Sequence, residues 1–145
     1  MPTIEERTHH EAAHGVMAHC VGGRFRYITM NPRTDKANAL TYGVTVPGQL
    51  AMVYVLLAGP LLESAIGGKP IGDVLTQPSG CSDFLKAAAL VEQLPGVDLG
   101  ATIADIDRRF ATPTRIRAIQ VVAKALLTRT RALTYREFVE LVGAL

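Results

Sequence analysis

The sequence predicts a mainly helical α+β fold with a small antiparallel sheet between the first and second helices. Helix-forming stretches with capping signals cover most of the chain, and two short segments rich in β-forming residues lie between the first two helices. At 145 residues, with 48% hydrophobic and 19% charged residues, the chain has the size and composition of one globular domain. No internal repeat or linker divides it, so we expect a single domain over residues 1–145.

The first helix and the strands follow from local signals. Thr3 followed by Glu6 is a capping-box pattern, so a helix is expected over residues 4–21, where Gly22-Gly23 ends it. Two antiparallel strands are expected at FRYITM (25–30) and ALTYGVTV (39–46), on either side of the polar loop 31–38, with room for a third short partner.

The second helix is expected from Gln49 to about Ile66, and because it is apolar nearly all round we place it at the centre of the fold. Its most apolar stretch, Leu50 to Leu62, has thirteen residues, contains Pro60 and ends against Glu63. A spanning helix needs about 20 apolar residues, so we expect a buried core helix and no membrane segment.

The remaining elements are helical. A loop rich in Gly, Pro and Ser is expected from Lys69 to Gly80, followed by a helix that Ser82 caps and that Pro95-Gly96 breaks. Three further helices are expected: Leu99 to Phe110, Pro113 to Thr130, and a last one with Thr134 and Glu137 as its capping box.

Cysteine usage and the N-terminus predict a cytoplasmic protein. Cys20 and Cys81 form neither a CxxC pair nor a dense disulfide framework, so two free thiols in a reducing compartment are expected. The N-terminus carries acids and histidines where a secretory signal has a basic start and an apolar stretch.

The candidate active site begins with His10-Glu11-Ala12-Ala13-His14 in the middle of the first helix. Residues four apart share one helix face, so the imidazoles of His10 and His14 can meet one zinc ion at roughly 2.0–2.1 Å. Glu11 lies off that face, where it can accept a proton from a water that the metal acidifies. The alternative to a metal site is that these residues occur in this order by chance, with the histidines on a solvated helix face. The position of the motif in the middle of a helix favours the metal site.

A catalytic zinc site needs a third protein ligand, and the candidates are His9, His19, Glu63, Cys81 and Asp83. His9 and His19 do not share the face of the motif comfortably, since they lie one residue before it and five residues after it. Glu63 ends an apolar helix, where a bare carboxylate is costly, and Asp83 follows a Gly-Cys-Ser turn. Spacing alone does not choose between these two acids.

Three motifs in this order, HEAAH, LAGPLLESAIGG and PSGCSDFLKAA, resemble the protease domain of the FtsH-type membrane-anchored AAA+ zinc proteases. The segment YITMNPRTDKANALTYGVTVPG and the tail ALLTRTRALTYREFVELV are also similar to that family, so the resemblance covers almost the whole chain. Ala13, Pro60 and Ser64 depart from the family pattern, which marks a distant relative.

The resemblance implies a role for each matching residue. His10 and His14 correspond to the zinc histidines, Glu11 to the general base, and Asp83 to the third ligand of one zinc ion per chain. Glu63 corresponds to a family glutamate, which implies a second-shell or structural role. The resemblance therefore favours Asp83 over Glu63 as the ligand.

The expected function is that of a zinc-dependent endopeptidase, an HExxH metallopeptidase acting on peptides or unfolded protein. The chain has no P-loop GxxxxGK[ST], so no ATP is expected as a cofactor, and the resemblance implies a stand-alone relative without the ATPase and membrane segments. A homo-oligomer and a separate ATPase partner are possible partners by the same resemblance. By resemblance to zinc peptidases generally, an extended substrate is a hypothesis for the exposed edge of the strand from Ala39 to Val46. The alternative is that this edge strand is simply short and solvated.

Two other functions are considered. The first is a zinc-binding but non-catalytic protein-interaction domain, for which Glu11 is dispensable. The second is nucleic-acid binding through residues 108–136, which hold eight basic residues and no acidic one. These charges are interleaved with an apolar stripe, so a solvated basic face is the preferred interpretation and nucleic acid is not the expected partner.

Overall fold

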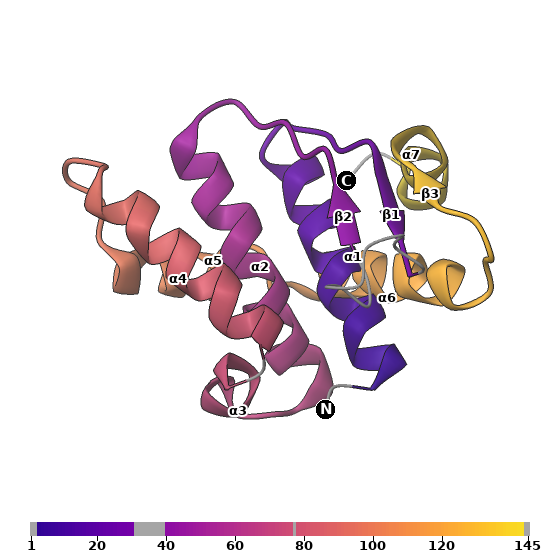
Figure 1. Cartoon of the computed structure of the whole chain (residues 1–145), viewed down its shortest axis with the longest axis horizontal. Helices are drawn as coiled ribbons and strands as arrows, with labels where there is room; N and C mark the ends of the chain where they lie inside the picture. Colours follow the sequence, from indigo (N-terminus) through magenta and orange to yellow (C-terminus); the bar gives the residue numbers. More distant parts are fainter. Residues whose placement is uncertain (1–2, 31–39, 77, 144–145) are drawn as a thin grey trace.

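The structure is a computed structural model that describes residues 3–30, 40–76 and 78–143. It confirms the predicted fold class, since helices dominate and a small antiparallel sheet includes the segments between the first two helices (Figure 1). In chain order the described elements are α1 (Ile4–Cys20), β1 (Tyr27–Thr29), β2 (Leu40–Tyr42), α2 (Gln49–Gly67), α3 (Ile71–Leu75), α4 (Pro78–Glu92), α5 (Leu99–Arg109), α6 (Pro113–Leu127), β3 (Leu133–Thr134) and α7 (Tyr135–Val142).

Helix α2 lies between α1 and α4, as Figure 1 shows, and packs against both. It contributes Val53, Leu57 and Leu62 to the core, which agrees with the core helix predicted for this segment. By length and composition α2 is also the described helix that could cross a membrane, with 50% of its apolar window buried inside the protein. Core helices of soluble proteins have the same length and composition, so the expected lack of a membrane segment stays a prediction.

The sheet has the order β2-β1-β3 and is antiparallel throughout. The two predicted strands are confirmed with three residues each, and Ile28 in β1 lies opposite Thr41 in β2. The third strand, β3, comes from the segment just before α7, where Leu133 pairs with Ile28. Strand β2 is therefore at one edge of the sheet. The predicted loop 31–38 lies outside the described residues, as does Ala39.

One buried core unites the helices and the sheet. Helix α1 supplies Val16 and Met17, the strand β1 supplies Ile28, and the last helix supplies Phe138, each at most 2% exposed. The ring of Phe138 meets Phe25 edge-on at 5.1 Å between centroids. The C-terminal helix is thereby attached to the same core as the helix that carries the HEAAH motif.

Some predicted boundaries are wrong, and the largest differences are in the helices. The predicted loop from Lys69 to Gly80 contains the helix α3, and α4 begins at Pro78, so Ser82 lies within that helix and is not its cap. Proline suits the first position of a helix because its missing N–H has no intrahelical partner there. Helix α6 ends at Leu127 and not at Thr130. The capping boxes at Thr3 and at Thr134 are both confirmed.

Candidate metal centre

Two histidines from α1 and one aspartate from α4 meet beside α2. His10 and His14 lie one turn apart, are 3% and 8% exposed, and face α2. Asp83 comes from the second turn of α4, because that helix begins earlier than the sequence predicts. The side chains from these two helices form the candidate metal centre.

Three atoms converge at this centre. The Oδ2 atom of Asp83 lies 2.8 Å from His10 Nε2 and 3.0 Å from His14 Nε2, and the two Nε2 atoms are 3.1 Å apart. Within the described residues this is the cluster of His, Cys, Asp and Glu side chains whose ligand atoms could hold a metal ion. Of the two acids left open by spacing, the structure places Asp83 among the converging atoms.

The outer nitrogens of both rings are also engaged. His14 Nδ1 lies 2.7 Å from the carbonyl oxygen of Val55, which only accepts, so this nitrogen donates. His10 Nδ1 lies 2.9 Å from Oε2 of Glu63, a carboxylate that is 5% exposed. Two neutral rings held in this way direct their Nε2 lone pairs at a carboxylate oxygen. Three acceptors at such short range need a positive charge between them.

A proton can supply that charge when no metal is bound. Burial by itself lowers the pKa of His10, but hydrogen bonds to Asp83 and Glu63 outweigh it and raise the pKa to about 10. Burial likewise lowers the pKa of His14, and the hydrogen bond to Asp83 outweighs it, so that this pKa is also raised. Burial raises the pKa of Asp83, yet its hydrogen bonds to both histidines lower it overall. A metal ion that enters this centre must therefore displace a proton.

The donor set fits a divalent metal such as zinc. Two imidazole nitrogens and one carboxylate oxygen are ligands that zinc takes in catalytic sites, and one ion can accept all three, whereas one proton cannot. Glu63 contacts Nδ1 of His10, and the Val55 carbonyl accepts a hydrogen bond from Nδ1 of His14. Hydrogen bonds of this kind, on the ring nitrogen away from the metal, orient metal-bound imidazoles. Glu63 contacts the outer nitrogen of His10 and does not contribute one of the three converging atoms.

Gly59 is a residue of this centre that the sequence analysis missed. A Cβ atom added there would lie 2.6 Å from His14 Nε2 and 2.8 Å from His10 Nε2, distances that real Cβ atoms do not show. The backbone of α2 therefore approaches the two histidines at a point where only glycine fits. The available signal was a glycine inside a long apolar helix, which is costly for helix stability unless a close approach requires it.

Glu11 lies between the two histidines in sequence and contacts the edge strand. Its Oε1 atom accepts hydrogen bonds from the backbone N–H and from the hydroxyl of Thr41 in β2, each at 2.8 Å. The carboxylate is half-buried, and its charge acts on both His10 and His14. The expected general base is thus held at the edge of the sheet, within electrostatic range of both histidines.

The other candidate ligands lie elsewhere. His9 Nδ1 contacts the carbonyl oxygen of Glu5 at 2.9 Å, and His19 Nδ1 contacts the hydroxyl of Tyr135 at 2.7 Å. Cys81 is exposed and is not part of the cluster. The interpretation that the two extra histidines do not share the face of the motif agrees with these positions.

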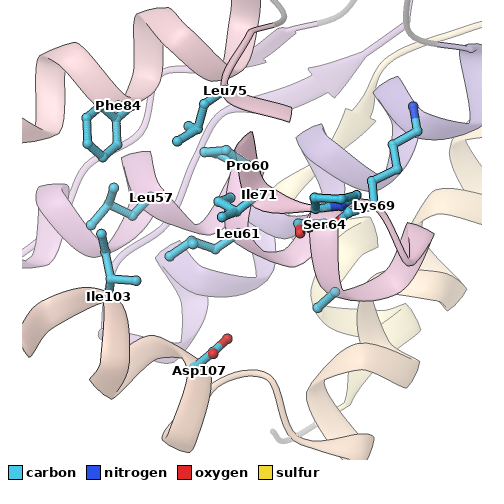
Figure 2. Close-up of a pocket in the computed structure, with 12 residues that line it drawn as sticks. Leu57, Pro60, Leu61, Ser64, Lys69, Ile71, Leu75, Phe84, Ile103 and Asp107 are labelled. Carbon is cyan, nitrogen blue, oxygen red and sulfur yellow. Dashed lines mark hydrogen bonds between the residues drawn. The ribbon is translucent and has the colours of Figure 1, made fainter. Parts of the chain in front are cut away.

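An apolar pocket of about 500 Å³ lies apart from the metal centre (Figure 2). Leu57, Pro60 and Leu61 line it from α2, and Phe84 lines it from α4. On α2, Leu57 and Leu61 point to the side opposite Gly59, the residue that approaches the histidines. None of the three candidate ligands lines this pocket.

The basic residues between 108 and 136 are largely paired or scattered. Arg108 pairs with Asp105, and Arg129 and Arg131 both pair with Glu137. The intervening apolar residues of α6, including Ile119 and Val122, are buried in the core. These contacts agree with a solvated, partly neutralised face.

Residues 6–72 match the family model described as Peptidase M50B-like, which is slightly less than half of the chain. The matched segment runs from α1 to the start of α3, so it includes the HEAAH motif, Gly59 and Glu63, and it excludes Asp83. The match supports a metallopeptidase-type function. It corrects the family suggested by the motifs, because the matched peptidase family is not the FtsH type. No curated protein and no solved structure matches the chain.

Proposed function

We propose that the chain is a zinc-dependent endopeptidase that hydrolyses peptide bonds in peptides or unfolded protein. The observation that carries this proposal is the convergence of two imidazole nitrogens and one carboxylate oxygen within 3.1 Å of one another. The carboxylate belongs to Asp83, which lies 73 positions after His10 and 69 after His14 in sequence. The match to a peptidase family over residues 6–72 supports it.

Each residue of the centre has a distinct role. His10 Nε2, His14 Nε2 and Asp83 Oδ2 would hold one zinc ion, with Glu63 and the Val55 carbonyl fixing the orientation of the two rings. When bound, zinc polarises the scissile carbonyl and lowers the pKa of water at the site. The three ligands leave part of the coordination shell for water and substrate, as catalytic zinc sites require.

Glu11 would act as the general base. Its carboxylate would take the proton from the attacking water and give it to the departing nitrogen, which then leaves as a neutral amine and not as an anion. Since β2 is an edge strand whose Thr41 contacts Glu11, an extended peptide added along this edge would place a scissile bond near the base.

The finer parts of the proposal come from the sequence motifs. A homo-oligomer, a separate ATPase partner and a cytoplasmic location are proposed on the sequence motifs or on composition alone. Substrates that are already unfolded are proposed, because this sequence contains no P-loop pattern that could power unfolding.

The test is hydrolysis of a reduced and alkylated model protein by the zinc-loaded chain and by its Glu11→Gln variant at equal zinc content. Because a general base contributes roughly 10²- to 10⁴-fold to such reactions, we expect at least a hundredfold loss of kcat in the variant. Cleavage products are followed by mass spectrometry, with a chelated sample as the metal-free control.

Two other outcomes contradict the proposal in different ways. Equal cleavage by the parent and by Glu11→Gln removes Glu11 as the base. Zinc binding without cleavage in both supports instead a zinc-binding interaction domain, for which Glu11 is dispensable.

A further inference from the structure

We propose that Thr41 is the positioning residue that holds the carboxylate of Glu11 in place for proton transfer. This inference rests on the proposed peptidase function, and it assigns a role to the edge strand β2 beyond contact with substrate. It follows from the contacts between one residue of β2 and one residue of α1.

Thr41 contacts Glu11 at three points. Its backbone N–H and its hydroxyl both lie 2.8 Å from Oε1 of Glu11, and the same hydroxyl lies 3.0 Å from the backbone carbonyl oxygen of Glu11. A hydroxyl has a single hydrogen, so it is shared between the two Glu11 oxygens, while the backbone N–H is a constant donor to the carboxylate. Oε1 is therefore held from two directions.

The strand that carries Thr41 is itself anchored. Thr41 lies opposite Ile28, which is fully buried, and the neighbouring pair Tyr27 and Tyr42 stacks with ring centroids 5.1 Å apart. The N–H of Thr41 is directed at Glu11 in α1 and not at β1. A register shift by one residue would move this donor away from Glu11, so the sheet register and the position of the carboxylate are coupled.

A free glutamate side chain samples many rotamers, and a general base loses efficiency when it must find its position in every turnover. Fixing Oε1 removes most of that freedom. Both hydrogen bonds from Thr41 to the carboxylate go to Oε1 and neither goes to Oε2, so Thr41 holds one carboxylate oxygen and leaves the other for proton transfer. This arrangement favours a role for Thr41 in fixing Glu11 for proton transfer over a role as a latch that keeps Glu11 away from the attacking water.

The experiment compares Thr41→Val and Thr41→Ser with the zinc-loaded parent chain. Valine keeps the shape and the backbone N–H but removes the hydroxyl, so we expect kcat to fall about tenfold, with KM within about twofold and zinc affinity unchanged. Serine keeps the hydroxyl and should restore most of kcat. Thr114→Val, an exposed position in α6, is the matched control and should behave like the parent.

A second measurement does not depend on turnover. A peptide hydroxamate binds a catalytic metal as its anion, and its proton needs an acceptor beside the metal, so Thr41→Val should weaken its binding about tenfold by calorimetry. Unchanged kcat and hydroxamate affinity in Thr41→Val would overturn the inference while the parent remains a peptidase. A rise in kcat would overturn it too, since it identifies a latch. A parent chain that cleaves nothing overturns the proposed function and this inference with it.

Discussion

At the scale of single residues, the candidate centre depends on how closely a backbone can approach two imidazoles. His10 and His14 are each held from behind, by Glu63 and by the Val55 carbonyl, so neither ring can turn away. Their Nε2 atoms face the helix α2 at Gly59, where even one methyl group would collide with them. The glycine is thus as much a part of the centre as the ligands are.

Gly59→Ala should impair metal binding. The added Cβ would lie 2.6 Å from His14 Nε2, so either the ring or α2 must shift, and we expect zinc affinity to fall roughly 10- to 100-fold, as for other changes behind metal ligands. Calorimetric titration with zinc measures this. Gly67→Ala is the matched control in the same helix, because a Cβ there meets nothing within 4 Å. Parent-like zinc affinity in Gly59→Ala would show that the centre is looser than these distances indicate.

At the scale of elements, local signals predicted what local interactions determine. The capping boxes at Thr3 and Thr134 each satisfy backbone donors within four residues, so short sequence patterns sufficed to place the starts of α1 and α7. The start of α4 was predicted wrongly because both Pro78 and Ser82 can begin a helix, and the choice between them depends on packing. Gly80 lies against Val74 of α3, where an added Cβ would be 2.4 Å from the carbonyl oxygen of Val74.

The site was predicted in the same uneven way. His10, His14 and Glu11 belong to one helix, so helical spacing alone was enough to group them. Asp83 joins them from 69 positions beyond His14, and spacing could not separate it from Glu63. A glycine inside an apolar helix indicated a close approach at Gly59 but could not show that the two histidines are its neighbours. No residue pattern along the chain reveals Thr41 as a donor from the edge strand.

The last helix provides a test of acid stability. Hydrogen bonds from Arg129, and then from Arg131 and Thr134, lower the pKa of Glu137 from 4.5 to about 2. A lowered folded-state pKa stabilises the fold above pH 4.5, and this stabilisation is lost as the pH falls from about 4.5 to 2. Glu137→Gln should therefore be less stable than the parent at pH 7, with the difference shrinking toward pH 2.

Urea unfolding of both chains at pH 7, 4 and 2.5 or so measures that difference, with chelator present so that the metal centre contributes equally. Glu140→Gln serves as the control, since this carboxylate is on the same helix but its side chain is 70% exposed. A difference between parent and Glu137→Gln that stays constant over this pH range would mean that the arginines do not stabilise the ionised carboxylate.

At the scale of the whole molecule, the metal centre lies where three helices meet. Helix α2 packs between α1 and α4, and the candidate ligands come from the two outer helices (Figure 1). An ion held by His10, His14 and Asp83 would therefore connect α1 to α4 across the central helix. Because an ion held in this way binds the folded chain and not the unfolded one, metal binding should stabilise the entire fold.

Removal of zinc should lower the melting temperature of the whole chain in one cooperative transition. Free zinc at about 100 times its Kd adds roughly 2.7 kcal/mol, which for a domain of this size corresponds to a shift of about 10 °C. Calorimetric scans with zinc and with chelator measure it. Asp83→Ala, which removes the ligand from α4, should melt at nearly the same temperature in both conditions. A parent chain that does not respond to zinc, or an Asp83→Ala chain that responds as strongly as the parent, would show that α1 and α4 are not joined through a metal at these residues.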